Sequence, residues 1–353
     1  LCRQRRTRAV VGTIADGRVR YVYQKNAGRS AARNRGIDLS VGEFICFLDD
    51  DDMFLRHKLE AQLAELAAHP ELDLISGGHV VVNADGIFTE SRPARCHFEL
   101  TETQFLFDCP FVVGAPLLRK RCVGLGIRFE RDYVPSEDWG FWLDLAKAGC
   151  RMAWLDSEVY VYRQHQTNSL RSFDPSASAI VAILDRYFLS ERVPAESRAV
   201  RGKVMGRAQL SLGIRLSDSG HHAKARAALS EAVGLWPAWQ KSERGDLATL
   251  IADTVVSLTF NHTGRGLAAR VVVNLGGPRS VDNGILLSVY CTLALKDFYR
   301  AYGMKDWLGA TQAILGAIRS RPSCLLNRGL LKMSLIAVRY ALTSTGRQQN
   351  NAR

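Results

Sequence analysis

The chain has 353 residues, enough for two domains with separate cores, and its apolar fraction of 47% and charged fraction of 23% exclude a largely disordered protein. The formal net charge of +12 suits partners that carry phosphate, such as a nucleotide diphosphate, a phosphorylated acceptor or an anionic membrane surface. Without zinc-finger spacing or an aromatic RNA-binding motif, the positive charge does not indicate nucleic acid.

The first half of the chain alternates patterns typical of strands and helices. Strands are predicted at Arg18–Gln24, Phe44–Leu48, Leu72–Ser76, His79–Val82 and Val159–Arg163. Helices are predicted at Ser30–Ile37, where Ser30 is the expected cap, at Leu55–Ala68, where Leu55, Leu59, Leu63 and Leu66 follow one side, and at Glu137–Ala148. This alternation predicts a mostly parallel, layered α/β domain over residues 1–175.

Beyond about Phe173 only helical patterns remain, so residues 176–353 are expected to form an all-α tail. Small and apolar residues recur there at the spacing of a tetratricopeptide helical hairpin: Leu212, Gly213, Leu216, Ala225, Leu229, Ala232 and Pro237, with a partial repeat at Ala310, Ile314, Ala317 and Pro322. The same spacing also arises in ordinary antiparallel helices. We expect this tail to dock to a protein partner or an anionic membrane surface, and not to take part in chemistry.

Five apolar residues, Phe44–Leu48, run directly into the four carboxylates of Asp49–Asp52. Such a short, dense apolar run is typical of a buried strand, and ligands of open α/β sheets lie at the carboxyl ends of strands. Four adjacent acids repel each other unless they share a cation. Because oxygen ligands favour Mg²⁺ or Mn²⁺, the pattern predicts a divalent-metal site.

A second acidic pair, Glu137 and Asp138, begins a predicted amphipathic helix. The helix dipole favours a charged carboxylate in the first turn, so these acids are expected to stay ionised at neutral pH. An ionised acid can take a proton from an attacking hydroxyl, although the same dipole lowers its basicity.

Four segments occur in this order at suitable intervals: QKNAGRSAARNRG (24–36), FLDDDD (47–52), SEDW (136–139) and YRQH (162–165). Together they make residues 8–172 resemble the family-two glycosyltransferases, which are inverting enzymes that use nucleotide-diphosphate sugars. The resemblance implies a GT-A-like (Rossmann-like) mixed sheet layered with helices.

The resemblance also implies roles for the acids. The Asp-x-Asp motif of the family falls on Asp49 and Asp51: Asp51 would bind Mn²⁺ or Mg²⁺ through the donor diphosphate, and Asp49 would lie near the ribose or the water shell of the metal. Asp52 is an extra acid or the cap of the next helix. Asp138 would be the catalytic base, and Glu137 would orient the acceptor or the backbone.

On the donor side, the resemblance assigns Arg33 to the nucleotide, since guanidinium forks suit phosphate oxygens. Asn34 and the turn residues Asn26 and Gly28 are expected beside it in the donor pocket. His165 would ligate the metal or contact the diphosphate, or else make a structural hydrogen bond.

The implied activity is transfer of a sugar, with a UDP-sugar as the default donor, to a hydroxyl of a bacterial polysaccharide, glycoconjugate or lipid-linked glycan. The alternatives are a non-enzymatic helical-repeat adaptor with an impaired α/β domain, and an aspartate-nucleophile phosphatase, whose motif wants Thr or Val where Met53 stands. The expected location is cytoplasmic, with the inner face of the membrane as a peripheral site. The eight cysteines form no Cys-x-x-Cys pair and are expected to be reduced thiols.

One departure from the family concerns the start of the chain. The opening strand, helix and second strand of such enzymes have no counterpart before the basic run Leu1–Arg8. We therefore expect this chain to bind nucleotide weakly and to expose an apolar strand edge.

Overall fold

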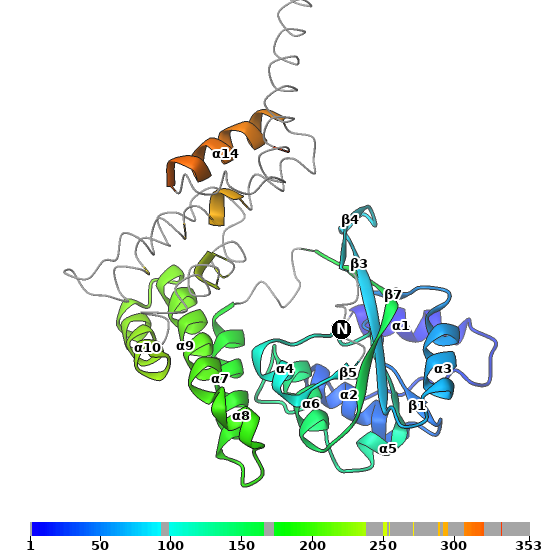
Figure 1. Cartoon of the computed structure of the whole chain (residues 1–353). Helices are drawn as coiled ribbons and strands as arrows, with labels where there is room; N and C mark the ends of the chain where they lie inside the picture. Colours follow the sequence, from blue (N-terminus) through cyan, green and yellow to red (C-terminus); the bar gives the residue numbers. More distant parts are fainter. Residues whose placement is uncertain are drawn as a thin grey trace, which may run out of the picture.

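The structure is a computed structural model (Figure 1). It describes residues 2–92, 99–165 and 173–237 and, farther along, residues 250–252, 254, 271, 289, 292–295, 307–320 and 333. Most of the expected tail beyond Pro237 therefore lies outside the described residues, and so does Pro322. Ala310, Ile314 and Ala317 are described and are buried in a helix over Trp307–Ser320.

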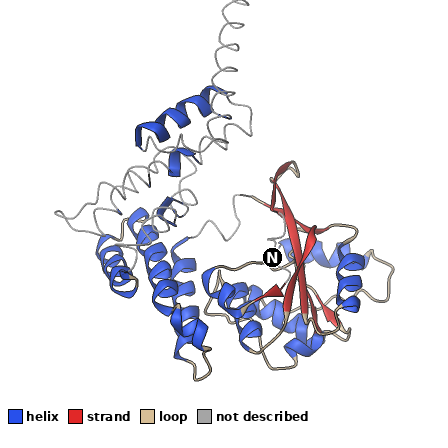
Figure 2. Ribbon diagram, viewed as in Figure 1, coloured by secondary structure: helices blue, strands red, loops and turns tan. Residues whose placement is uncertain are grey.

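A seven-stranded sheet forms the centre of the first half (Figure 2). Its strands are β1 (Phe44–Ile45), β2 (Met53–Phe54), β3 (Leu74–Val82), β4 (Phe88–Arg92), β5 (Glu99–Leu100), β6 (Leu117–Arg119) and β7 (Met152–Arg163). The order is β1-β6-β3-β7-β2, with β4 on β3 and β5 on β7. Among the described strands only β3 and β7 pair in parallel, so the sheet is mixed, as the resemblance implies. The expectation of a mostly parallel sheet was wrong, because short return strands run back against β1, β3 and β7.

Three strand predictions need correction. Of the predicted strand Phe44–Leu48 only Phe44–Ile45 pairs as β1, and Leu48 is 52% exposed. Arg18–Gln24 is not a strand: no described strand pairs with it, and Tyr23 is 66% exposed. Apolar alternation alone does not make a strand when no neighbour accepts its backbone hydrogen bonds. The two predicted strands from Leu72 to Val82 form the single strand β3, which turns into β4 at the predicted turn, where Gly86 has φ +82°.

The helices are α1 (Cys2–Gly12), α2 (Gly28–Leu39), α3 (Lys58–Ala68), α4 (Glu102–Phe107), α5 (Lys120–Val123), α6 (Glu137–Lys147), α7 (Phe173–Leu189), α8 (Ala195–Ala199), α9 (Arg201–Asp218), α10 (His222–Leu235) and α14 (Trp307–Ser320). No helix among the described residues is long and apolar enough to span a bilayer.

Helices α2 and α3 both form, although α3 begins at Lys58 and not at Leu55, and two further details differ. Ser30 does not cap α2; its hydroxyl donates to the carbonyl of Glu130. The predicted leucine side of α3 is only partly buried: Leu66 is fully buried, whereas Leu59 and Leu63 are 44% and 39% exposed. The buried side carries Lys58 and Gln62, whose side chains both donate to the Ala115 carbonyl. These hydrogen bonds satisfy polar groups that the apolar pattern placed at the surface.

The first helices of the tail share a core with the sheet domain. Ile183, Tyr187 and Met205 belong to the same buried apolar cluster as Phe141 and Trp142 of α6. An ion pair of 2.6 Å between Arg186 and Asp144 also joins α7 to α6. Helices α7 to α9 therefore form a wall of the sheet domain, whereas the division at residue 175 remains a prediction.

Helices α9 and α10 form the predicted hairpin (Figure 1). A Cβ atom at Gly213 would lie 2.6 Å from Cγ of Leu229, so only glycine allows this approach of the two helices. Ala225, Leu229 and Ala232 are buried along the same seam. This packing explains the small-residue spacing, and ancestry from a repeat remains a prediction.

Candidate active site

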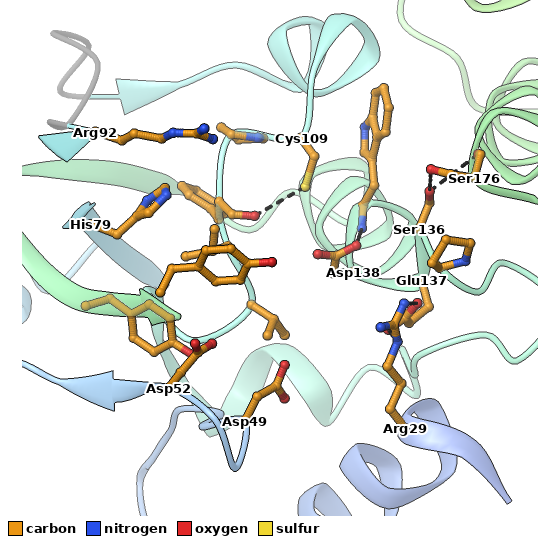
Figure 3. A pocket seen from close by; sticks show the side chains of 18 of the residues that line it. Arg29, Asp49, Asp52, His79, Arg92, Cys109, Ser136, Glu137, Asp138 and Ser176 are labelled. Atoms are coloured by element: carbon orange, nitrogen blue, oxygen red, sulfur yellow. Dashed lines mark hydrogen bonds and ion pairs between the residues drawn. The ribbon is translucent and has the colours of Figure 1, made fainter. Parts of the chain in front are cut away.

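A cavity of about 720 Å³ lies where the acidic loop after β1, the start of α6 and the β3–β7 face meet (Figure 3). Its lining includes the acids Asp49, Asp50, Asp51, Asp52, Glu137 and Asp138, the arginines Arg29 and Arg33, and His165. The two acidic motifs, almost 90 positions apart in the sequence, thus line one cavity.

Asp52 holds the acidic loop in place. Its Oδ2 atom accepts a hydrogen bond of 2.7 Å from the Tyr160 hydroxyl, and its Oδ1 atom accepts one of 2.7 Å from the Arg163 amide. Burial raises the pKa of this carboxyl above its ordinary value. Asp52 therefore joins the loop to β7, and the alternative that it caps the next helix is wrong; that cap position belongs to His57.

Asp51, a predicted metal ligand, contacts His165, another predicted ligand, in the cavity lining. Its Oδ2 atom lies 2.7 Å from Nε2 of His165, with side chains 36% and 25% exposed. Asp49 is placed differently, because both of its carboxylate oxygens accept hydrogen bonds from Arg33. Among the described residues no group of three His, Cys, Asp or Glu side chains converges as a metal site. Asp51 and His165 form an adjacent oxygen–nitrogen pair in the cavity lining, and their role as metal ligands remains a prediction.

Arg33 lies at the centre of a charge network. Its side chain is 9% exposed, and its guanidinium donates to Asp49 at 2.9 Å and to Glu137 at 2.8 Å. Arg29 also pairs with Glu137, donating to Oε2 at 2.9 Å. The side chain of Glu137 is only 2% exposed, and a carboxylate so deeply buried needs such partners. In this arrangement Glu137 joins α2 to α6 and orients the two arginines, a contact that was not expected from the sequence.

Asp138 is a second carboxyl of the site whose pKa is raised. Burial, with the nearby charge of Glu137, raises its pKa to about 6, while Arg33 and Arg29 oppose the rise. The helix dipole had suggested a shift in the opposite direction. A carboxyl with this pKa is mostly ionised at neutral pH and is more basic than an ordinary aspartate, so the expected loss of basicity does not apply.

Three residues expected in the donor pocket are not among those that line the cavity. Asn34 exchanges two hydrogen bonds of 2.9 Å with the backbone of Phe129. Asn26 accepts the amide of Gly28, which begins α2 with φ +85°. These contacts shape the turn and the helix that present Arg29 and Arg33; a role of Asn26, Gly28 and Asn34 in donor binding remains a prediction.

The helical tail contributes to the cavity as well. Ser176 and Ile180 of α7 and Arg215 of α9 belong to the lining, and Oγ of Ser176 lies 3.0 Å from Oγ of Ser136 beside the two acids. The first helices of the tail thus help to line the cavity, and the expectation that the tail takes no part in chemistry remains a prediction. No local motif marks these residues.

Residues 2–122 match the family model described as Glycosyl transferase family 2. This part of the chain belongs to that family. The glycosyltransferase domain so defined contains the Asp49–Asp52 loop and Arg33, whereas the acidic pair of α6 follows the matched segment.

Curated relatives agree with the family. The chain is 28% identical over 156 residues to the amylovoran biosynthesis glycosyltransferase AmsB of Erwinia amylovora, covering 40% of this chain and 51% of that protein. It is 25% identical over 142 residues to the Escherichia coli glucosyltransferase WfgD, covering 40% and 53%. A segment of 136 residues is 52% identical to an uncharacterized glycosyltransferase of Rickettsia felis, covering 37% and 21%. The chain thus spans about half or less of the length of these relatives.

Among solved structures, Staphylococcus aureus TarS 1–349 is similar with a TM-score of 0.40 and 14% identity, covering 78% of this chain and 71% of that one. A mannosyltransferase of Pyrobaculum calidifontis, solved with GDP-mannose and Mn²⁺, has a TM-score of 0.39 and 16% identity, covering 72% and 68%.

Proposed function

We propose that this protein transfers a sugar from a nucleotide-diphosphate donor, with a UDP-sugar as the default, to a hydroxyl of a polysaccharide or glycoconjugate acceptor, with inversion at the anomeric carbon. The observation that carries this proposal is the shared cavity of Asp138 and the Asp49–Asp51 loop. Asp138 is available to take a proton, and the acids of the Asp49–Asp51 loop are available to the diphosphate side of a donor. The relatives that act in glycan synthesis support the same reaction class.

In the proposed reaction Asp138 takes the proton of the acceptor hydroxyl while that oxygen bonds to the anomeric carbon. The bond from this carbon to the nucleotide diphosphate breaks on the opposite face, and inversion results from this in-line arrangement. Arg33 and Glu137 act indirectly: their ion pair fixes α2 against α6 and so sets the distance between Asp49 and Asp138.

The donor set fits a divalent cation. Asp51 and His165 present an oxygen and a nitrogen beside each other, and Asp51 is a better candidate ligand than Asp49, whose oxygens are occupied by Arg33. When bound, Mn²⁺ or Mg²⁺ supplies positive charge for the departing diphosphate.

The pKa of Asp138 predicts the pH dependence of the reaction. A base acts only when deprotonated, so kcat/KM should rise with pH through about 6, the raised pKa of this carboxyl, and level off toward neutral pH. An unperturbed aspartate would place this limb near pH 4. Initial rates between about pH 5 and pH 8, at saturating Mn²⁺, measure the position of the limb. A flat profile down to pH 5 would show that Asp138 is not the titrating base.

A screen of nucleotide sugars tests the proposed function itself. The protein is incubated with UDP-, GDP- and dTDP-sugars and Mn²⁺, and release of nucleoside diphosphate is measured with and without glycoside acceptors. We expect release with at least one donor and its loss when the cation is chelated. A non-enzymatic adaptor would release none with any donor.

A further inference from the structure

Two residues that line the cavity each carry a buried ring nitrogen with no hydrogen-bond partner within the described part of the chain. These nitrogens are Nε1 of Trp154, a side chain that is 7% exposed, and Nε2 of His79. Trp139 also lines the cavity, but its Nε1 atom has a partner, since it donates to the Phe105 carbonyl at 2.6 Å. Because buried polar groups normally have partners, an unpaired pair at a ligand cavity points to partners supplied by a ligand.

The wall that carries these nitrogens is aromatic. His79 of β3 is the register partner of Tyr160 of β7, and its ring meets that of Tyr162 edge to face at 6.3 Å. The ring of Trp154 packs against Phe111 at 5.2 Å. His79 lies across the cavity from Asp138 (Figure 3). Aromatic faces with polar tips suit a sugar ring, which has apolar C–H faces and hydroxyl edges.

This wall differs in charge from the acidic loop and its arginines. Burial lowers the pKa of His79 to about 4, so its imidazole is neutral at neutral pH and can donate or accept one hydrogen bond at each nitrogen. Arg92, which also lines the cavity, is paired with Glu90 at 2.6 Å. A neutral, hydrogen-bonding surface favours the hydroxyls of a sugar over a phosphate.

We propose that Trp154 and His79 determine acceptor specificity by hydrogen-bonding two hydroxyls of a neutral acceptor sugar whose reacting oxygen faces Asp138. This inference rests on the proposed function, and it adds the residues that would select the acceptor. The indole N–H of Trp154 donates to one hydroxyl, and Nε2 of His79 donates to or accepts from another.

The test uses the full chain, the donor found by hydrolysis, and octyl glycosides of glucose, galactose and N-acetylglucosamine as acceptor probes. Trp154→Phe removes the N–H and keeps an aromatic ring, whereas His79→Met removes the polar tip at similar length. We expect each variant to lower acceptor kcat/KM by on the order of 10-fold to 100-fold, with a much smaller change in donor KM. His79→Gln, whose amide can replace Nε2, should recover much of the loss.

Trp142→Phe is the matched control. Trp142 is fully buried and its Nε1 also has no partner among the described residues, but it does not line the cavity. This variant should lower the melting temperature without a selective change in acceptor KM. Unchanged acceptor kcat/KM in Trp154→Phe and His79→Met would overturn the inference, and so would a loss confined to donor KM. Donor hydrolysis by the unsubstituted protein tests the proposed function separately.

Discussion

Replacing Asp138 with asparagine should lower turnover by on the order of 10²- to 10⁴-fold, because the amide cannot accept the proton of the acceptor hydroxyl. The fold should persist: Oδ1 of Asp138 accepts the Trp139 amide at 2.9 Å, and an asparagine oxygen can accept the same bond. Donor affinity should hardly change. Steady-state kinetics together with calorimetric titration of the donor separate these two quantities.

Asp144→Asn is the control on the same helix. Asp144 pairs with Arg186 at 2.6 Å and is absent from the cavity lining. Loss of this partly exposed ion pair costs on the order of 1 kcal/mol or less in the free energy of unfolding, and turnover should stay near that of the unsubstituted protein. Normal turnover in Asp138→Asn would mean that another group is the base.

The second large effect is expected from Asp51→Ala, which should abolish Mn²⁺-dependent nucleotide binding. The side chain contacts His165 and is 36% exposed, so the substitution removes one acid from a mutually repelling set without opening the core. The anchor of the loop remains, since Arg163 donates to the backbone carbonyl of Asp51 at 3.0 Å. Calorimetry with UDP, in Mn²⁺ and in chelator, measures the loss.

Asp50→Ala is the matched control in the same loop. Asp50 is exposed, and no hydrogen bond of its side chain is found within the described residues. We expect it to keep most of the Mn²⁺-dependent affinity. Equal affinity in Asp51→Ala and the unsubstituted protein would contradict the metal assignment, whatever the outcome for Asp50→Ala.

The sequence by itself placed the two acidic motifs at the ends of their elements and carried the resemblance to the family. An apolar run that ends in Asp49–Asp52 and a Glu137–Asp138 pair at a helix start are local patterns, and local patterns depend on few neighbours. Helix α6 begins and ends where its sequence indicates, with Gly149 at φ +85° just beyond its end. For the same reason the α9–α10 hairpin followed from the spacing of small residues.

Only the tertiary structure decided how these residues are used. The pairing of Glu137 with Arg29 and Arg33 joins residues more than 100 positions apart, and the contact of Asp52 with Tyr160 does the same. The sheet is mixed because return strands pair with β1, β3 and β7, and Arg18–Gln24 is no strand because no described strand pairs with it. The raised pKa of Asp138 likewise depends on burial by distant segments, which outweighs the local helix dipole. Burial and long-range pairing are properties of the packed chain, and no window of sequence contains them.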